Sequence, residues 1–438
     1  MNCLRSDLWQ SQDMNADRGS IVIENSTTGS SPRRIRLINV VAALQSLHAA
    51  GSMSRAELAR RLGLNRSSSG QIVSEVTQSG LVREVDDSDT ASGPANRSAG
   101  RPGILLELVP EAAFFVGIEI GVEHISAVTM DLAGKTRTHS RLAFDAPSAT
   151  VDEAVSRAVQ MAFGAMSASM IDRCQGVGIS APMHIRPDGV VSLAPLIGWR
   201  DIELSRHVAA ALPVNVPIMI ENDANAFAIG DCYKHSASGV TLFLLMETGV
   251  GGGILIDGKL FRGGHGLAGE IGHMVVPGSG GSSLEQLVGR DVLIRRYRAE
   301  ATNPQADFQD FLSAVRDREP AAVSVAEDWS RNLGVALYQA CRSIDPERIV
   351  LGGSVASLYP LVAARVAVHM RKTQSVSFPA PNIVVNDDAE FGSAYGAACL
   401  LHQRFISLDN DQLVTEPAST LRLPPQSIQD IQSVESVV

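Results

Sequence analysis

The feature that most constrains the fold is a long alternation of strand-like and helix-like segments between Glu107 and about Phe405. Short runs rich in β-branched and large apolar residues, such as FFVGIEIG, GVGISA and RIVLGGS, alternate with amphipathic stretches such as residues 151–171. That order is typical of α/β proteins. Because about 300 residues exceed what one hydrophobic core usually supports, we expect two lobes, at residues 107–235 and 236–405, with the final helix returning to the first lobe.

The segment before this alternation carries a local positive charge within an acidic protein. The chain of 438 residues has 37 basic and 47 acidic side chains and a net charge of −10, so contact with nucleic acid requires a local basic surface. Residues 31–85 supply one, since they hold eight arginines against three glutamates, a charge of +5. We expect residues 31–106 to form a separate small domain, residues 1–30 a mobile tail and residues 406–438 a polar C-terminal extension.

Two short helices joined by a tight turn are predicted within the basic segment. Ser54 and Glu57 have the spacing of a capping box at the start of the first helix, and Gly63 ends it. The second helix begins at Arg66, stops at Gly80 and turns its apolar residues inward. Hydrogen-bonding side chains at this spacing suit a recognition helix in a major groove. The side chains that we expect to contact DNA are Arg66, Ser67, Ser68, Gln71 and Ser74.

A wing is expected to follow these helices. Residues 81–83 begin a strand, and the Gly-, Ser- and Pro-rich loop at residues 86–103 would place Arg97 and Arg101 at the wing tip, facing DNA. The sequence therefore predicts a winged helix-turn-helix. An ordinary three-helix packing module with a solvated polar face is the alternative. The local charge and the basic loop favour DNA binding over that alternative.

Three glycine-rich turns in the α/β segment follow predicted strands. They lie within residues 117–134, 246–258 and 349–356. Glycines after a strand allow backbone N–H groups to approach a phosphate, although one such turn alone is weak evidence. Around these turns lie ENDANAFAIGD and GLAGEIGHMVV. Carboxylate, amide and imidazole side chains at this density suit a ligand with many hydroxyl groups. The residues concerned are Asn222, Asp223, Glu270 and His273.

At these motifs the chain resembles the ROK family, which comprises repressors and sugar kinases of the actin/hexokinase-like fold. The resemblance covers about residues 35–405 and rests on the combination of ENDAN, TGVGGG and GEIGHMVV. It implies an α/β fold of two lobes, and the preceding winged helix-turn-helix resembles the repressor branch. The family's sugar pocket, carried over by position, implies as sugar-binding residues Asn222, Asp223, Glu270, His273 and Glu285.

Two of these positions have simpler structural explanations. In the family's kinases the aspartate at position 223 is the general base that takes the proton from the attacking sugar hydroxyl. In this chain its role could be limited to binding that hydroxyl. Asn222 and Asp223 could also serve as a helix N-cap pair. His273 could be a core histidine with its hydrogen bonds satisfied inside the protein.

The chain departs from the family at the zinc site. Most ROK members bind zinc through the histidine of GEIGH and a cysteine-rich run that follows it. The corresponding stretch here, VVPGSGGSSLEQLVG, has no cysteine, so we expect no metal. The five cysteines of the chain form no CxxC pair, which favours a reducing cytoplasm over a disulfide framework. No apolar stretch suits a membrane span or a signal peptide, so we expect a cytoplasmic protein without membrane contact.

The first phosphate turn departs as well. Kinases of the family resemble DxGGT, whereas residues 119–123 read EIGVE. Val122 hinders close approach of the backbone, and Glu123 places a carboxylate near the phosphate position. At about 4 Å and an effective dielectric constant near 20, one such repulsion costs about 4 kcal/mol. Glu247 adds a further negative charge at the second turn. We therefore expect poor ATP binding, no cofactor and no catalysis.

The sequence as a whole predicts a sugar-responsive regulator that represses genes for carbohydrate uptake or catabolism. It would bind operator DNA and a sugar or sugar phosphate as a homodimer or homotetramer. The alternative is an ATP-dependent kinase of a hexose or amino sugar with an appended DNA-binding domain, in which Asp223 is the base. A structural protein whose ROK fold only dimerises is disfavoured, because the polar pocket residues are retained.

Overall fold

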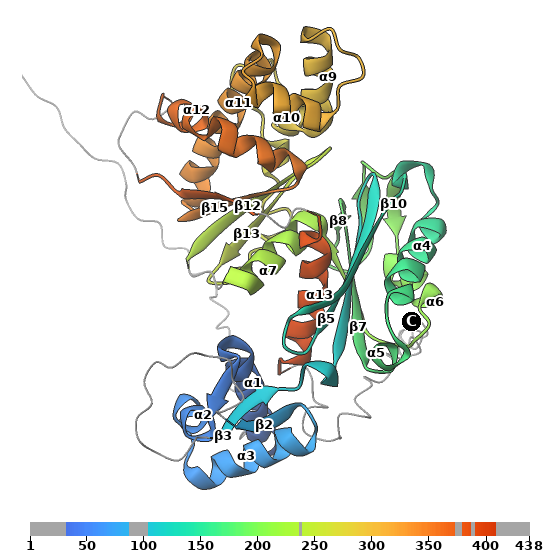
Figure 1. The fold of residues 1–438 in the computed structure, drawn as a ribbon, viewed down its shortest axis with the longest axis vertical. Coiled ribbons are helices and arrows are strands. Elements are labelled where there is room, and N and C mark those ends of the chain that lie inside the picture. Colours follow the sequence, from blue (N-terminus) through green and yellow to red (C-terminus); the bar gives the residue numbers. More distant parts are fainter. Residues whose placement is uncertain (1–31, 87–103, 236–238, 373–378, 387–389, 409–438) are drawn as a thin grey trace, which may run out of the picture.

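The computed structural model describes residues 32–86, 104–235, 239–372, 379–386 and 390–408. These residues form a small N-terminal domain and two α/β lobes, with two helices running between the lobes (Figure 1). The predicted N-terminal tail, Arg97, Arg101 and most of the predicted C-terminal extension lie outside the described residues. Within the described residues, no helix is long and apolar enough to cross a membrane.

The N-terminal domain is a winged helix-turn-helix. Its elements are α1 (Pro32–Ala50), β1 (Ser52–Ser54), α2 (Arg55–Leu62), α3 (Arg66–Gln78), β2 (Val82–Asp86) and β3 (Ile104–Leu108). The predicted capping box at Ser54 and Glu57 is present, and Gly63 ends α2 in the left-handed conformation with a φ of 65°. β3 pairs antiparallel with β1 and β2. Since β3 continues to Leu108, the predicted domain boundary after residue 106 falls inside the wing strand and has to move beyond it.

Lobe 1 is built on a five-stranded sheet in the order β11-β7-β4-β5-β6. Its strands are β4 (Phe114–Ile120), β5 (His124–Asp131), β6 (Thr136–Ala143), β7 (Cys174–Ala181) and β11 (Ile218–Asn222). Its helices are η1 (Pro110–Ala112), η2 (Ala146–Ser148), α4 (Val151–Gly164), α5 (Ala168–Asp172) and α6 (Leu204–Ala211). β4 and β7 are parallel and buried along their whole length, which explains their continuous apolar sequences. A small second sheet contains β8 (His184–Ile185), β9 (Val191–Ala194) and β10 (Trp199–Ile202).

Lobe 2 has a second five-stranded sheet in the order β14-β13-β12-β15-β16. Its strands are β12 (Val240–Met246), β13 (Val250–Ile256), β14 (Lys259–Leu260), β15 (Arg348–Gly352) and β16 (Asn382–Val385). Its helices are η3 (Ile271–His273), α8 (Glu285–Val288), α9 (Arg290–Glu300), α10 (Phe308–Arg316), α11 (Pro320–Ile344), η4 (Ser354–Leu358) and α12 (Tyr359–Lys372). The core of this lobe is a large apolar cluster that includes Trp329 and Phe311, both fully buried.

Two helices occupy the space between the sheets, α7 (Asp223–His235) and α13 (Gly392–Phe405) (Figure 1). α13 comes last in the described chain, yet it packs against β4, β5 and β7 of lobe 1. Glycines allow this close approach, because a Cβ added at Gly117 of β4 would lie 1.9 Å from the carbonyl oxygen of Ala394. α7 packs against α13 on one side and against β12 and β13 of lobe 2 on the other.

Candidate functional site

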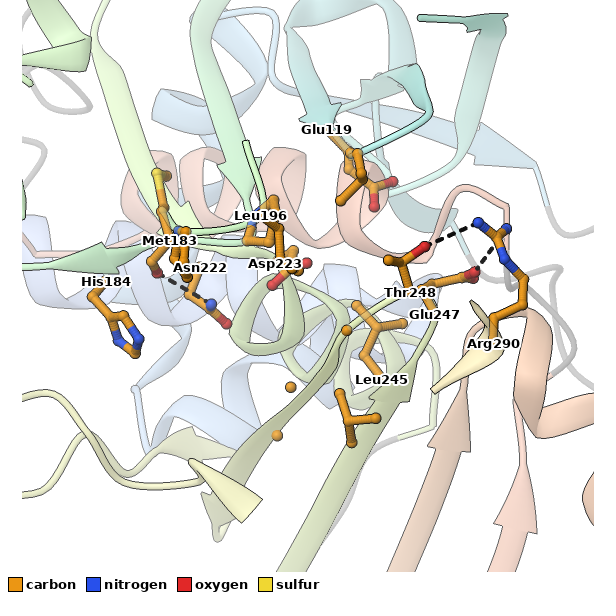
Figure 2. Close-up of a pocket in the computed structure, with 18 of the residues that line it drawn as sticks. Glu119, Met183, His184, Leu196, Asn222, Asp223, Leu245, Glu247, Thr248 and Arg290 are labelled. Atoms are coloured by element: carbon orange, nitrogen blue, oxygen red, sulfur yellow. Dashed lines mark hydrogen bonds and ion pairs between the residues drawn. The ribbon is translucent and has the colours of Figure 1, made fainter. Parts of the chain in front are cut away.

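A pocket at the junction of the two lobes collects most of the polar residues that the motifs predicted (Figure 2). Lobe 1 contributes the turn between β4 and β5, and lobe 2 contributes the glycine turn between β12 and β13. The start of α7 and the region around η3 complete the wall. Four predicted sugar-binding residues line this pocket, namely Asn222, Asp223, Glu270 and His273.

Asn222 and Asp223 are positioned by the end of β11 and the start of α7. The Asn222 side chain accepts a hydrogen bond from the backbone N–H of Asn225 at 3.1 Å and donates one to the carbonyl of Met183 at 3.2 Å. An Asp223 carboxylate oxygen accepts the N–H of Ala224 at 2.8 Å. The helix-cap explanation therefore holds for Asn222, and both side chains nevertheless face the pocket.

Burial raises the pKa of Asp223 from 3.8 to about 7, and the neighbouring carboxylates of Glu119 and Glu270 add to the shift. Glu119 lies in the first phosphate turn and accepts a hydrogen bond from the Ser126 hydroxyl at 2.8 Å. Near neutral pH the Asp223 carboxyl therefore exists in both protonation states. It can donate a hydrogen bond to a sugar hydroxyl when protonated and accept one when ionised.

This raised pKa predicts a pH-dependent stability. Because the folded protein holds the Asp223 proton more tightly than the unfolded chain, binding of this proton stabilises the folded state. This contribution to the free energy of unfolding is complete below about pH 4 and is lost as the pH rises through about 7. We expect Asp223→Asn to be more stable than the wild type by about 2 kcal/mol at pH 8 and equally stable at pH 4. Urea unfolding at both pH values measures the difference, with the exposed Asp172→Asn as control. An equal difference at both pH values would contradict the assignment.

Glu270 lies between two histidines at the other end of the pocket. Its carboxylate oxygens are 3.4 Å from Nδ1 of His184 and 3.7 Å from Nε2 of His273. The His273 side chain is 59% exposed, so its interpretation as a core histidine is wrong. His184 was not predicted, because it belongs to the short strand β8 and to no motif. Its proximity to Glu270 arises only in the folded chain.

Glu285, the fifth predicted sugar-binding residue, lies beside the glycine turn between β12 and β13. It is absent from the pocket wall. Its carboxylate instead accepts a hydrogen bond from the backbone N–H of Val250 at 3.0 Å, and a Cβ added at Gly249 would lie 3.1 Å from it. Glu285 therefore supports the glycine turn between β12 and β13, and its contact with a sugar stays a prediction.

The glycine turns meet at an arginine that the motifs did not predict. Arg290, the first residue of α9, lies 2.5 Å from the carboxylate of Glu123 in lobe 1. In lobe 2 it donates a hydrogen bond to the Thr248 hydroxyl at 3.0 Å and lies 3.8 Å from Glu247 (Figure 2). Glu247 also accepts the N–H of Ser354 at 2.6 Å, which joins the second glycine turn to the third. A network of charged side chains thus connects the three turns.

The predicted DNA-contacting face of α3 is open to solvent over most of its length. Arg66, Ser67, Gln71 and Ser74 are exposed, and Ser68 is half-buried. The inner face of the helix is buried and contains Ile72, Val73, Val76 and Ser69. An ion pair of 2.5 Å between Arg36 of α1 and Glu75 of α3 fixes the first helix of the domain to the third.

A model of the ROK family matches residues 115–404. The chain belongs to the ROK family. The xylose repressor of Bacillus spizizenii is 25% identical over 346 residues, which cover 75% of this chain and 85% of the relative. A ROK family glucokinase from Streptomyces griseus, solved with glucose and AMPPNP, is 26% identical with a TM-score of 0.59, over 66% of this chain and 100% of its own. A ROK family transcriptional regulator, a homologue of the E. coli MLC protein, has a TM-score of 0.68 and 20% identity over 88% of this chain and 99% of its own. That match shows a shared fold.

Among the described residues, no cysteine accompanies His273 in the way typical of the zinc site of the ROK family, although possible ligand atoms of His184, Glu270 and His273 lie within 4.8 Å of one another. The four described cysteines are Cys174, Cys232, Cys341 and Cys399, which lie in β7, α7, α11 and α13. The loop after His273 is instead closed by hydrogen bonds. The Ser279 and Ser282 hydroxyls each donate to the other residue's carbonyl, at 3.0 and 3.2 Å, and the Val276 N–H donates to the Ser282 carbonyl at 3.1 Å. Serine side chains therefore close a loop that zinc ligands close elsewhere in the family.

Proposed function

We propose that this ROK protein is a sugar-responsive transcriptional regulator that represses genes of carbohydrate uptake or catabolism. The observation that carries the proposal is the presence, in one chain, of a winged helix-turn-helix with an exposed polar α3 face and a ROK domain with a polar pocket. The similarity to a xylose repressor supports it, since the aligned region covers 75% of this chain. The protein would act in the cytoplasm as a homodimer or homotetramer, because paired operator half-sites require paired DNA-binding domains.

The effector in this proposal is a sugar or a sugar phosphate. Asn222, Asp223, Glu270 and His273 would bind its hydroxyl groups, and His184 joins this set because it contacts Glu270 on the pocket wall. Carboxylate, amide and imidazole groups offer both donors and acceptors to neighbouring hydroxyls. Neither a metal ion nor a nucleotide has a part in the proposed function.

Variants of α3 test the DNA-binding part of the proposal. Arg66→Ala and Gln71→Ala should each weaken binding to the DNA upstream of the protein's own gene by about tenfold, because each removes one polar contact to a phosphate or a base. Wild-type affinity should fall steeply with salt, since arginines displace counterions from the phosphates. Fluorescence anisotropy with a labelled duplex measures both effects. Arg157→Ala, an exposed arginine of α4 in lobe 1, is the control and should bind like the wild type. Binding that is independent of salt, or unchanged in both α3 variants, would count against the DNA-binding face.

One observation favours the kinase as a second candidate function. Asp223 occupies the position of the family's general base, and its pKa of about 7 suits proton transfer near neutral pH. Phosphoryl transfer also requires a γ-phosphate held in line with its charge neutralised. In this chain Glu123 and Glu247 lie beside the turns that would hold the phosphates, and Arg290 is paired with both. We therefore place regulation first and kinase activity second.

A further inference from the structure

We propose that helix α7 transmits the state of the sugar pocket to the DNA-binding domain. The first residue of α7, Asp223, lines the pocket, and Tyr233 near its other end contacts His48 of α1. At about 1.5 Å per residue, the helix spans roughly 15 Å between these two residues. The inference rests on the proposed function for the ligands at its two ends, and on the contacts below for the connection between them.

α7 and α13 are packed too closely to slide independently. A Cβ added at Gly396 of α13 would lie 1.7 Å from the carbonyl oxygen of Ala226, and one at Gly230 of α7 would lie 2.9 Å from that of Gly392. Helices in such backbone contact have no flexible side chains between them to absorb a displacement. A shift of α7 is therefore passed on to α13.

Lobe 2 also holds α7 directly. The buried carboxylate of Asp231 lies 3.1 Å from Arg348 of β15 and accepts a hydrogen bond from Asn386 at 2.7 Å. A movement of lobe 2 toward lobe 1 around a sugar would therefore act on α7 at Asp231 as well as at Asp223. This ion pair and this hydrogen bond to a buried carboxylate attach α7 firmly to lobe 2.

Three aromatic rings form the contact at the far end of α7. The His48 ring centroid lies 5.0 Å from that of Tyr233 and 4.8 Å from that of His402 on α13. Burial lowers the pKa of His402 to about 3, so its ring is neutral. Its Nε2 donates to the Leu132 carbonyl at 2.7 Å, and its Nδ1 accepts from the Tyr233 hydroxyl. The neutral His402 ring therefore connects α7, α13 and lobe 1, and the His48 ring packs against it.

Further contacts connect α13 to α1, and α1 to the DNA-contacting helix α3. Gln45 of α1 donates to the Ile406 carbonyl just after α13, at 2.9 Å. One apolar cluster includes Leu44 and Leu47 of α1, Phe115 of lobe 1 and Phe405 of α13. Within the domain, the Arg36–Glu75 ion pair connects α1 to α3. A change at α7 can thus reorient the DNA-contacting helix.

Hydrogen exchange of the full-length protein, without sugar or DNA, tests this route. Asn222→Ala removes the side-chain cap of α7, so exchange in its first turn should accelerate about fivefold. The route requires exchange in α1 to rise at least about twofold in the same variant. Thr150→Ala, which removes the side-chain cap of α4 in lobe 1, should leave α1 unchanged. In the reverse direction, His48→Ala should accelerate exchange at residues 223–226.

Four outcomes decide the proposal. Faster exchange of α1 in Asn222→Ala alone, with faster exchange at residues 223–226 in His48→Ala, supports it. Exchange of α1 at the wild-type rate in Asn222→Ala overturns it, and so does an equal increase in Thr150→Ala, which would indicate general loosening. If Asn222→Ala fails to fold, His48→Ala decides alone, and an unchanged first turn of α7 then overturns the route. Because neither sugar nor DNA is present, these results are independent of the binding assays that test the proposed function.

Discussion

Asp223→Ala is expected to abolish the rise in melting temperature that a bound sugar produces in the wild type. Asp223 lies at the pocket wall, where its carboxyl can make charged hydrogen bonds with two neighbouring hydroxyls. Loss of such bonds should weaken the binding of the sugar by about a hundredfold. The thermal shift then disappears at a sugar concentration that just saturates the wild type. Glu270→Ala should behave in the same way, because Glu270 presents the second carboxylate at the pocket wall.

A thermal-shift screen of sugars measures this effect, with D-xylose and D-glucose as the first probes. Asp172→Ala on the outer helix α5 is the matched control, since it removes an exposed carboxylate outside the pocket and should keep the full shift. Operator binding should survive in Asp223→Ala and no longer respond to sugar. If a variant retains the full thermal shift, the substituted residue does not bind the sugar.

With ATP, magnesium and a sugar that it binds, the protein is expected to form no sugar phosphate. Val122 hinders approach to the first phosphate turn, and the carboxylates of Glu123 and Glu247 repel the phosphates. Arg290 neutralises part of this charge, but its guanidinium is held by Glu123 at 2.5 Å and by Thr248 at 3.0 Å. A phosphate would have to displace these contacts before Arg290 could bind it.

The paired substitution Val122→Gly with Glu123→Thr tests this explanation. It removes the side chain and the charge that oppose a phosphate, and it frees Arg290 from its partner in lobe 1. Weak binding of ATP, seen as a thermal shift that the wild type lacks, is the expected result. Glu203→Thr, at an exposed glutamate outside the pocket, is the control for the loss of one charge. Sugar phosphorylation by the wild type at about 1 per second or faster would contradict the account and establish the kinase.

Local signals account for the parts of the fold that the sequence predicted. The capping box at Ser54 and Glu57 and the left-handed turn at Gly63 depend only on residues a few positions apart, so α2 and α3 could be located with their polar faces. The ROK motifs likewise placed Asn222, Asp223, Glu270 and His273 around one pocket before the fold was known.

The parts that the sequence missed depend on contacts between distant segments. Arg290 contacts Glu123 across the two lobes, and His184 of β8 contacts Glu270 just before η3. In each pair the two residues are far apart in the sequence and belong to no common motif, so the contact could not be predicted from their spacing. The hydrogen bond from the Val250 N–H to Glu285 could not be predicted either, because the two residues are 35 positions apart.

Sugar-dependent DNA binding is tested most directly by one titration of DNA performed twice. The full-length protein is titrated into a labelled duplex of the DNA upstream of its own gene, first without sugar and then with a sugar that raises its melting temperature. Regulation of DNA binding by the sugar predicts salt-sensitive binding whose dissociation constant changes by about tenfold or more with the sugar. A dissociation constant that stays the same with a sugar that does bind, or no binding of the duplex at low salt, would contradict it.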